Sequence, residues 1–269
     1  MKTFVMGDVH GEMDFHKVYR EAGHENDRLL QVGDFGLVFN VMQTRAELDR
    51  LKDMQNHWKE VFFVDGNLEN FTCLNRFPLQ TRYGGKVRQL APNVFWMQRG
   101  EVFDFDGQTV WAMGGADSVD KHWRTKDHDW WAEELPTWDE MNYGMDNLEK
   151  VDWKVDYVLS HTCPNKVKHM MMQYMRLKPN DVHLEKYFDE VVEKLDFYKW
   201  YFGHFHVDVT LGNQFVGLFN YLVELGDEVP EHSDDFKSGF MAPDQCEGLP
   251  PLPCTKEEVL RAMKKDYLG

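Results

Sequence analysis

The sequence predicts an α/β fold in which two packed β-sheets are flanked by helices. Strand-like apolar runs alternate with helical segments in the amino-terminal part, and closely spaced runs joined by turns follow later in the chain. Alternating strands and helices are typical of parallel pairing and hairpins of antiparallel pairing, so both sheets are expected to be mixed. With 269 residues the chain is long enough for one sizeable α/β domain and rather short for two.

The amino-terminal part is expected to contain three strands and two helices. The expected strands cover residues 2–6, 29–33 and 60–64, and the expected helices cover 12–22 and 45–58. Thr44 and Glu47 form a capping-box pattern, in which each side chain satisfies a free backbone N–H at the start of a helix. Leu48, Leu51 and Trp58 then follow at helical spacing.

The later elements are predicted from turns and shorter periodic runs. Three apolar runs lie within residues 93–115, and the Asp106-Gly107 turn between the last two favours a hairpin. A Gly212-Asn213 turn predicts a further antiparallel connection. The remaining expected elements are a helix over 181–195 and strands over 155–160, 199–203 and near 215–225.

We expect one main domain over residues 1–226 and a carboxyl-terminal tail over 227–269 that packs on it. Five of the ten prolines fall within 226–254, and Thr255 begins a capping-box pattern that predicts a terminal helix. Within the main domain, residues 116–150 show little strand character and are expected to form a cap-like insertion. Long connections inside compact domains are often functional.

Composition excludes several classes of partner. The net charge of −16 argues against extended binding to a nucleic-acid backbone, which requires a basic surface. No apolar run approaches the length of a membrane span, and the first strand begins too early for a signal peptide. The four cysteines, Cys73, Cys163, Cys246 and Cys254, lack metal-type spacing. They are expected to be free thiols in a reducing cytoplasm.

Potential metal ligands follow five of the predicted strands. They are Asp8, His10, Asp34, Asn67, His161, His204 and His206. In open α/β sheets, ligands bind at the carboxyl ends of the strands, so these side chains are expected to meet. Residues two apart in extended chain point the same way, which allows Asp8 with His10, and His204 with His206, to address one centre.

The donor set indicates the kind of metal. Carboxylate and imidazole donors without thiolate suit Mn²⁺, Fe or Zn²⁺ better than Ca²⁺ or a cysteine-rich structural zinc site. Seven ligands are too many for one catalytic ion that must keep a position open, whereas two ions that share a bridging carboxylate fit the count. We expect two divalent ions, with Mn²⁺ as the first choice and Fe, Zn or Ni as alternatives.

Taken in chain order, these motifs resemble the calcineurin-like metallophosphoesterase family. They read Asp-x-His at 8–10, Gly-Asp at 33–34, Gly-Asn-x-Glu at 66–69, His161 after a strand, and Gly-His-x-His at 203–206. The resemblance runs from about residue 4 to residue 206. It implies a four-layer sandwich of two mixed β-sheets flanked by helices, and a metal-dependent hydrolase that cleaves phosphoesters.

The resemblance also implies a role for each ligand. The implied ligands of the first ion are Asp8, His10, Asp34 and His206, and those of the second are Asp34, Asn67, His161 and His204. Asp34 then bridges the two ions, and a hydroxide between them attacks phosphorus in line with the leaving oxygen. No nucleophilic side chain is needed.

One position departs from the family pattern. Leu68 stands where the family has a histidine that protonates the leaving oxygen or stabilises the transition state, and leucine does neither. General acid catalysis contributes about 10²–10⁴-fold in rate. Three interpretations stay open: a substitution introduced to trap a ligand, a natural variant with a good leaving group or another acid, and a degenerate binder.

The substrate is less well specified. The segment after Asp34 lacks the arginine with which protein phosphatases continue this motif, which favours a phosphodiester or small nucleotide over a phosphoprotein. In the 116–150 segment, Lys121, His122, Trp123 and Arg124 are expected to contact substrate, or else the tryptophans there form a small core of their own. A non-catalytic binder of nucleotides or phosphopeptides and a protein phosphatase are the alternative functions. The oligomeric state is not predicted.

Overall fold

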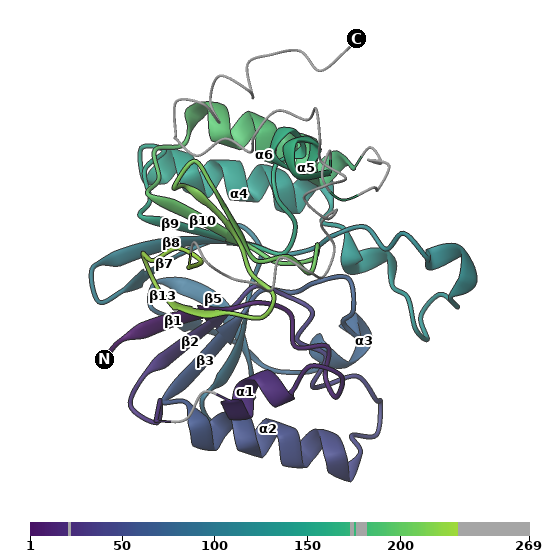
Figure 1. The fold of residues 1–269 in the computed structure, drawn as a ribbon. Helices are drawn as coiled ribbons and strands as arrows, with labels where there is room; N and C mark the ends of the chain where they lie inside the picture. The colour runs from purple at the N-terminus through teal and green to yellow at the C-terminus, as the bar shows by residue number, and fades with distance from the viewer. Residues whose placement is uncertain (21–22, 173–174, 176–181, 231–269) are drawn as a thin grey trace, which may run out of the picture.

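The structure is a computed structural model that describes residues 1–20, 23–172, 175 and 182–230. Two sheets pack against each other, and helices cover the outer side of each sheet (Figure 1). The predicted four-layer α/β sandwich is therefore confirmed. The terminal helix expected from Thr255 onward, and most of the 227–269 tail, lie outside the described residues.

The first sheet has seven strands, and its central strands are parallel. The strand order is β13-β1-β2-β3-β6-β5-β4. The strands are β1 (Thr3–Met6), β2 (Arg28–Gln31), β3 (Glu60–Phe63), β4 (Leu79–Arg82), β5 (Gly85–Ala91), β6 (Val94–Met97) and β13 (Leu222–Glu224). Strands β1, β2, β3 and β6 pair in parallel, and β13, β5 and β4 are antiparallel to their neighbours. The carboxyl ends of β1, β2 and β3 therefore lie along one edge.

The second sheet has six strands in the order β11-β12-β10-β9-β8-β7. The strands are β7 (Glu101–Phe105), β8 (Gln108–Met113), β9 (Tyr157–Ser160), β10 (Lys199–Phe202), β11 (Val209–Leu211) and β12 (Phe215–Gly217). Strands β8, β9, β10 and β12 pair in parallel, whereas β7 and β11 are antiparallel to their neighbours. Both sheets are mixed, as the sequence predicts.

Three apolar layers hold the sandwich together. Phe62, Val64, Leu159 and Tyr201 belong to the layer between the sheets and are fully buried. The outer helices of the first sheet are α1 (His16–Arg20), α2 (Arg45–His57) and α3 (Phe71–Leu74). Those of the second are α4 (Trp138–Lys150), α5 (Asn165–Met172) and α6 (His183–Lys194) (Figure 1). The apolar layer beneath each set of helices is separate from the central one.

Several elements differ from the sequence prediction. The helix expected over 12–22 is limited to His16–Arg20 among the described residues. Strands β4 and β5 and helix α3 were not expected; β4 alternates exposed and half-buried residues, so its apolar signal is weak. Helix α4 begins at a capping box of Thr137 and Glu140 and packs on β7 and α6. The projecting part of the 116–150 segment is therefore confined to the residues before this helix.

The strand expected near 215–225 is two strands that belong to different sheets. β12 lies in the second sheet and β13 in the first, so the chain crosses between them. The carboxylate of Asp208 accepts hydrogen bonds from the backbone N–H groups of Phe219, Asn220 and Tyr221. These bonds satisfy the backbone of the crossing segment, which therefore needs no partner strand.

A buried ion pair joins β3 to the start of β7. Asp65, directly after β3, accepts from Nε of Arg99 at 3.0 Å and from its Nη2 at 2.5 Å, and both side chains are almost fully buried. Trp96 donates its indole N–H to the other oxygen of Asp65 at 3.0 Å. The Arg99 guanidinium also donates to the Glu133 carbonyl, which ties down the segment before α4.

Arg99→Met should destabilise the protein by about 3–5 kcal/mol, because it leaves the Asp65 carboxylate buried without its cation. The free energy of unfolding in urea is the measurement. Arg45→Met is the matched control. It removes an exposed pair with Asp49 on α2 and should cost less than about 0.5 kcal/mol. If both substitutions lowered the free energy of unfolding equally, the buried pair would contribute no more to stability than the exposed one.

Candidate metal centre

The seven predicted ligands follow five parallel strands that end at the same side of the sandwich. Asp8 and His10 follow β1, Asp34 follows β2, and Asn67 follows β3. From the second sheet, His161 directly follows β9, and His204 and His206 follow β10. The two sheets therefore contribute to one site.

Four of these residues have positive backbone φ angles, which non-glycine residues rarely adopt. The angles are 49° at His10, 52° at Asp34, 67° at His204 and 53° at His206. Each such residue costs of order 1–3 kcal/mol and persists only where the surroundings enforce it. Here the backbone N–H of His10 donates to the Asp34 carbonyl at 2.7 Å, which links the loops after β1 and β2. Such a cluster of strained residues is typical of a functional site.

Two glycines are required because ligand side chains lie directly against them. A Cβ atom on Gly66 would lie 2.1 Å from Oδ1 of Asp34, and one on Gly203 would lie 2.1 Å from Oδ1 of Asp8. The sequence explains these glycines only as turn residues. The structure shows that they also make room for the two carboxylates.

Asp8, His10 and His206 form the first group of donor atoms. Oδ2 of Asp8 lies 3.2 Å from Nε2 of His206 and 3.7 Å from Nε2 of His10. The two Nε2 atoms are themselves 3.2 Å apart. Oδ2 of Asp34 lies 3.2 Å from Nε2 of His10, so Asp34 joins this group.

The second group contains Asp34, His161 and Asn67. Oδ1 of Asp34 lies 3.3 Å from Nε2 of His161, and Oδ1 of Asn67 lies 3.2 Å from the same nitrogen. The two oxygens of Asp34 therefore face different groups, as a bridging carboxylate does. The ring centroid of His204 lies 5.1 Å from that of His161, beside this group, and its backbone N–H donates to Asp8.

These donors fit divalent transition metals. Two donors that bind one ion with bonds of about 2.1 Å at tetrahedral or octahedral angles lie roughly 3.0–3.4 Å apart. The separations within the two groups are 3.2–3.3 Å for most pairs. The Nε2 atoms of His10 and His206 face each other. If both carry a lone pair they repel, whereas a cation bound to both nitrogens accepts both lone pairs. The family typically binds two such ions, and Asp/His clusters suited to them are present.

The electrostatics of the cluster favour added positive charge. Burial lowers the pKa of His161, but the carboxylates of Asp34 and Asp8 outweigh burial and raise this pKa to about 10. Burial raises the pKa of Asp34, but His161 and His10 hold it well below its usual value. Burial, with the neighbouring His161, lowers the pKa of His204 to about 3. The ring of His204 is therefore neutral and keeps a lone pair for a metal.

Residues that the sequence did not single out hold the ligands in place. Asp14 contacts Nδ1 of His10 at 2.6 Å, which directs Nε2 of that ring to the centre. The carbonyl of Val32 does the same for Nδ1 of His161 at 2.7 Å. The ring of Phe219 stacks on His206 with centroids 4.5 Å apart. Only Asp14 could have been found from the sequence, because it is an acidic residue four positions after His10.

A second supporting chain reaches Asn67 from the segment before α4. Nδ2 of Asn67 donates to Oγ of Ser118 at 3.2 Å, and that hydroxyl donates to Glu134 at 2.6 Å. Glu134 also accepts from the backbone N–H of Ser118 at 3.0 Å, and both residues are buried. Because Ser118 takes the amide N–H, the amide oxygen of Asn67 faces the other ligands.

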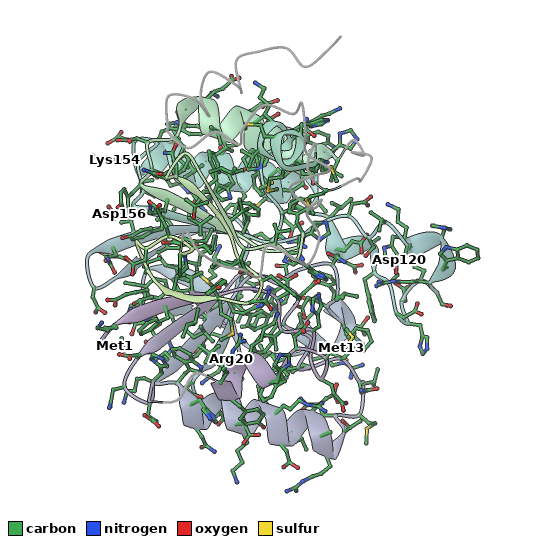
Figure 2. All side chains as sticks on the ribbon, in the orientation of Figure 1. Met1, Met13, Arg20, Asp120, Lys154 and Asp156 are labelled. Carbon is green, nitrogen blue, oxygen red and sulfur yellow. The ribbon has the colours of Figure 1, made fainter. Side chains whose placement is uncertain are left out.

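The residues predicted to contact substrate lie on an arm. Lys121, His122 and Trp123 form the short 3₁₀ helix η1 (Lys121–Trp123) of the segment that projects from the body near Asp120 (Figure 2). Lys121 pairs with Asp117 and Arg124 with Asp120, so both cations are held within the arm. Trp123 is 83% exposed, whereas Trp131 is buried against Phe39 of the main body. The described tryptophans therefore do not form a core of their own.

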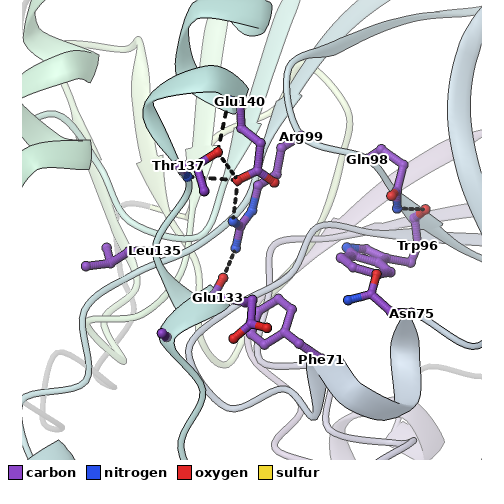
Figure 3. Close-up of a pocket in the computed structure, with 10 residues that line it drawn as sticks. Phe71, Asn75, Trp96, Gln98, Arg99, Glu133, Leu135, Thr137 and Glu140 are labelled. Carbon is purple, nitrogen blue, oxygen red and sulfur yellow. Dashed lines mark hydrogen bonds and ion pairs between the residues drawn. The ribbon is translucent and has the colours of Figure 1, made fainter.

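A small pocket lies beside Arg99 of the buried Asp65–Arg99 pair (Figure 3). Its volume is about 240 Å³, and Phe71, Trp96 and Arg99 line it. The guanidinium of Arg99 is already held by Asp65, by the Glu133 carbonyl and by Glu140. None of the predicted metal ligands lines this pocket.

Comparisons with known proteins show the family of the chain. Among solved structures, the chain is similar to the phosphopantetheinyl hydrolase (PptH) from Mycobacterium tuberculosis, with 15% sequence identity and a TM-score of 0.43. The match covers 86% of this chain and 98% of that one. No curated protein matches the chain. The model of the calcineurin-like phosphoesterases matches residues 1–208. The chain therefore belongs to the calcineurin-like phosphoesterase family.

Proposed function

We propose that the protein hydrolyses a phosphodiester or a small nucleotide at a dinuclear metal centre held by the seven predicted ligands. Membership in a metal-dependent phosphoesterase family supports the reaction class. The observation that carries the dinuclear centre is the placement of Asp34, whose Oδ2 faces His10 and whose Oδ1 faces His161. Mn²⁺ is our first choice of metal because the donors are carboxylate, amide and imidazole.

The residues of the chain position the reaction. Bound ions supply Lewis acidity and activate water for attack at phosphorus. Asp8, His10 and His206 hold one side of the centre, and Asn67, His161 and His204 hold the other. Leu68 donates its backbone N–H to Oδ1 of Asp34 at 2.7 Å and so fixes the bridging carboxylate. Its side chain supplies no proton, which favours a substrate with a good leaving group.

None of the helices within the described residues has the length and apolar character of a membrane span. Because Leu68 removes an acid, the alternative is a non-catalytic receptor for nucleotides or phosphopeptides. A protein phosphatase is the least favoured of the three functions, because the arginine with which protein phosphatases continue the motif after Asp34 is absent.

Asp34→Asn should abolish turnover of bis-p-nitrophenyl phosphate in Mn²⁺. We expect a fall of at least about 10²-fold, the scale of losing one electrostatic group that stabilises a transition state. Metal content, measured on the same samples, should fall as well, because the bridge is lost. Asp49→Asn on the surface of α2 is the control and should change neither quantity. Tight nucleotide binding without turnover in the unmodified protein would favour the receptor instead.

Leu68→His should raise turnover of an unactivated phosphodiester, because it places a proton donor beside the centre. The gain expected is up to about 10²–10⁴-fold. The gain should be smaller for a p-nitrophenyl ester, whose leaving group needs no proton. The measurement is kcat for both substrates in both proteins. No gain with the unactivated ester would count against the account of a missing acid.

Ser118→Ala should weaken metal binding by roughly tenfold or more, because the Asn67 amide loses the acceptor that fixes its orientation. Calorimetric titration with Mn²⁺ measures this directly. Thr81→Ala, on the exposed edge strand β4, removes a hydroxyl far from the ligands and serves as the control. An unchanged affinity in Ser118→Ala would mean that Asn67 is not a ligand or is held by other contacts.

A further inference from the structure

A pocket of about 400 Å³ adjoins the candidate metal centre. Its walls include His10 from the loop after β1, Gly36 from the loop after β2, and Leu68 from the loop after β3. The first turns of α2, through Thr44 and Arg50, close the far side. The volume is within the range of pockets that bind small molecules. Because His10 and Leu68 belong to both, the pocket and the centre are continuous.

Apolar side chains line part of the pocket. Leu68 and Phe39 are half-buried, and the ring of Phe39 is fixed by an edge contact with Trp131 at 5.6 Å between centroids. Met13 lies at the rim, 70% exposed, and is labelled at the surface in Figure 2. An exposed methionine beside a pocket adapts its shape to an apolar ligand.

Polar side chains of the pocket are hydrogen-bonded or ion-paired with other groups of the protein. The carboxylate of Glu47 accepts from the backbone N–H groups of Phe39, Asn40 and Thr44. Arg50 pairs with Glu12 at 2.7 Å, at the outer end of the pocket. His10 is directed to the metal centre by Asp14. Each of these groups is therefore held by another group of the protein.

We propose that this pocket binds the organic group of the substrate, and that this group is an apolar alcohol acidic enough to leave unprotonated, such as a phenol or an enol. The proposal rests on the proposed function, because the phosphoryl group must lie at the metal centre for its organic group to reach Leu68, and it narrows that function to an aryl or enol phosphodiester. Leu68 then has two roles: its backbone holds Asp34, and its side chain selects an apolar leaving group.

The reaction balances without an acid from the pocket. The oxygen of water forms a bond to phosphorus, and the bond between phosphorus and the aryl or enol oxygen breaks. The phenolate or enolate leaves with the bonding electron pair, and the proton of the water passes to solvent. An alkoxide from an ordinary alcohol is too basic to leave in this way, which restricts the substrate class.

Binding of two phosphonates to the Mn²⁺-loaded protein tests the pocket apart from turnover. Phenylphosphonate should bind roughly 10–100-fold more tightly than methylphosphonate, since burying a ring removes about 100 Å² or more of apolar surface from water. Leu68→Asn should reduce this ratio at least about fivefold, because it replaces an apolar side chain of the pocket with an amide. Leu79→Asn, on the exposed edge strand β4, is the matched control and should leave the ratio unchanged.

Met13→Gln is a second variant in case Leu68→Asn disturbs the fold, because an exposed residue at the rim can be replaced without unfolding the protein. It should also lower the ratio. Equal affinities for the two phosphonates in the unmodified protein, or a ratio unchanged in both variants, would overturn the pocket assignment alone. No binding of either phosphonate would overturn the metal-centre proposal and the pocket with it.

Discussion

The carboxylate of Asp34 is the contact on which the site depends, because it joins the ligands of both sheets. One of its oxygens faces His10 from the first sheet, and the other faces His161 from the second. Its backbone carbonyl accepts the N–H groups of Val9 and His10, and its side chain accepts the N–H of Leu68. A shift of this residue would therefore disturb the ends of β1, β3 and β9.

The surrounding structure compensates for placing buried carboxylates and strained backbone at one point. Positive φ angles at His10, Asp34, His204 and His206 are unfavourable individually. A backbone hydrogen bond joins His10 to Asp34, and the backbone N–H of His204 donates to Asp8. Asp8 and Asp34 are nearly inaccessible to solvent, so their charges need cations. The carboxylates raise the pKa of His161, and we propose that bound metal compensates their charge further. Stability and function are coupled here because the same charges serve both.

The sequence predicted the parts of the fold and site that depend on local pattern. Strands β1, β2, β3, β9 and β10 were identified because each is a short apolar run that ends at a polar residue. The predicted ligands were chosen because they follow these strands in an order that resembles a family, and their binding of metal stays a prediction. Helix α4 was missed, although Thr137 and Glu140 carry the same capping pattern that located α2.

Other features could not be predicted because they depend on contacts between distant parts of the chain. Ser118 supports Asn67 across 51 positions, and Arg99 pairs with Asp65 across 34. Neither spacing has a periodic signal. The residues expected to contact substrate were chosen for their chemistry, and this stays a prediction. The pocket beside Leu68 is instead built from α2 and the strand loops. Only the tertiary structure places α2 there.

The most direct test of the account is a crystal structure of the protein grown with Mn²⁺, with anomalous diffraction recorded at the manganese edge. We expect two anomalous peaks, one among Asp8, His10 and His206 and one among Asn67, His161 and His204, with an oxygen of Asp34 bound to each. A map without a peak at these residues, or with a single ion that Asp34 does not contact, would contradict the claim that Asp34 bridges two metals.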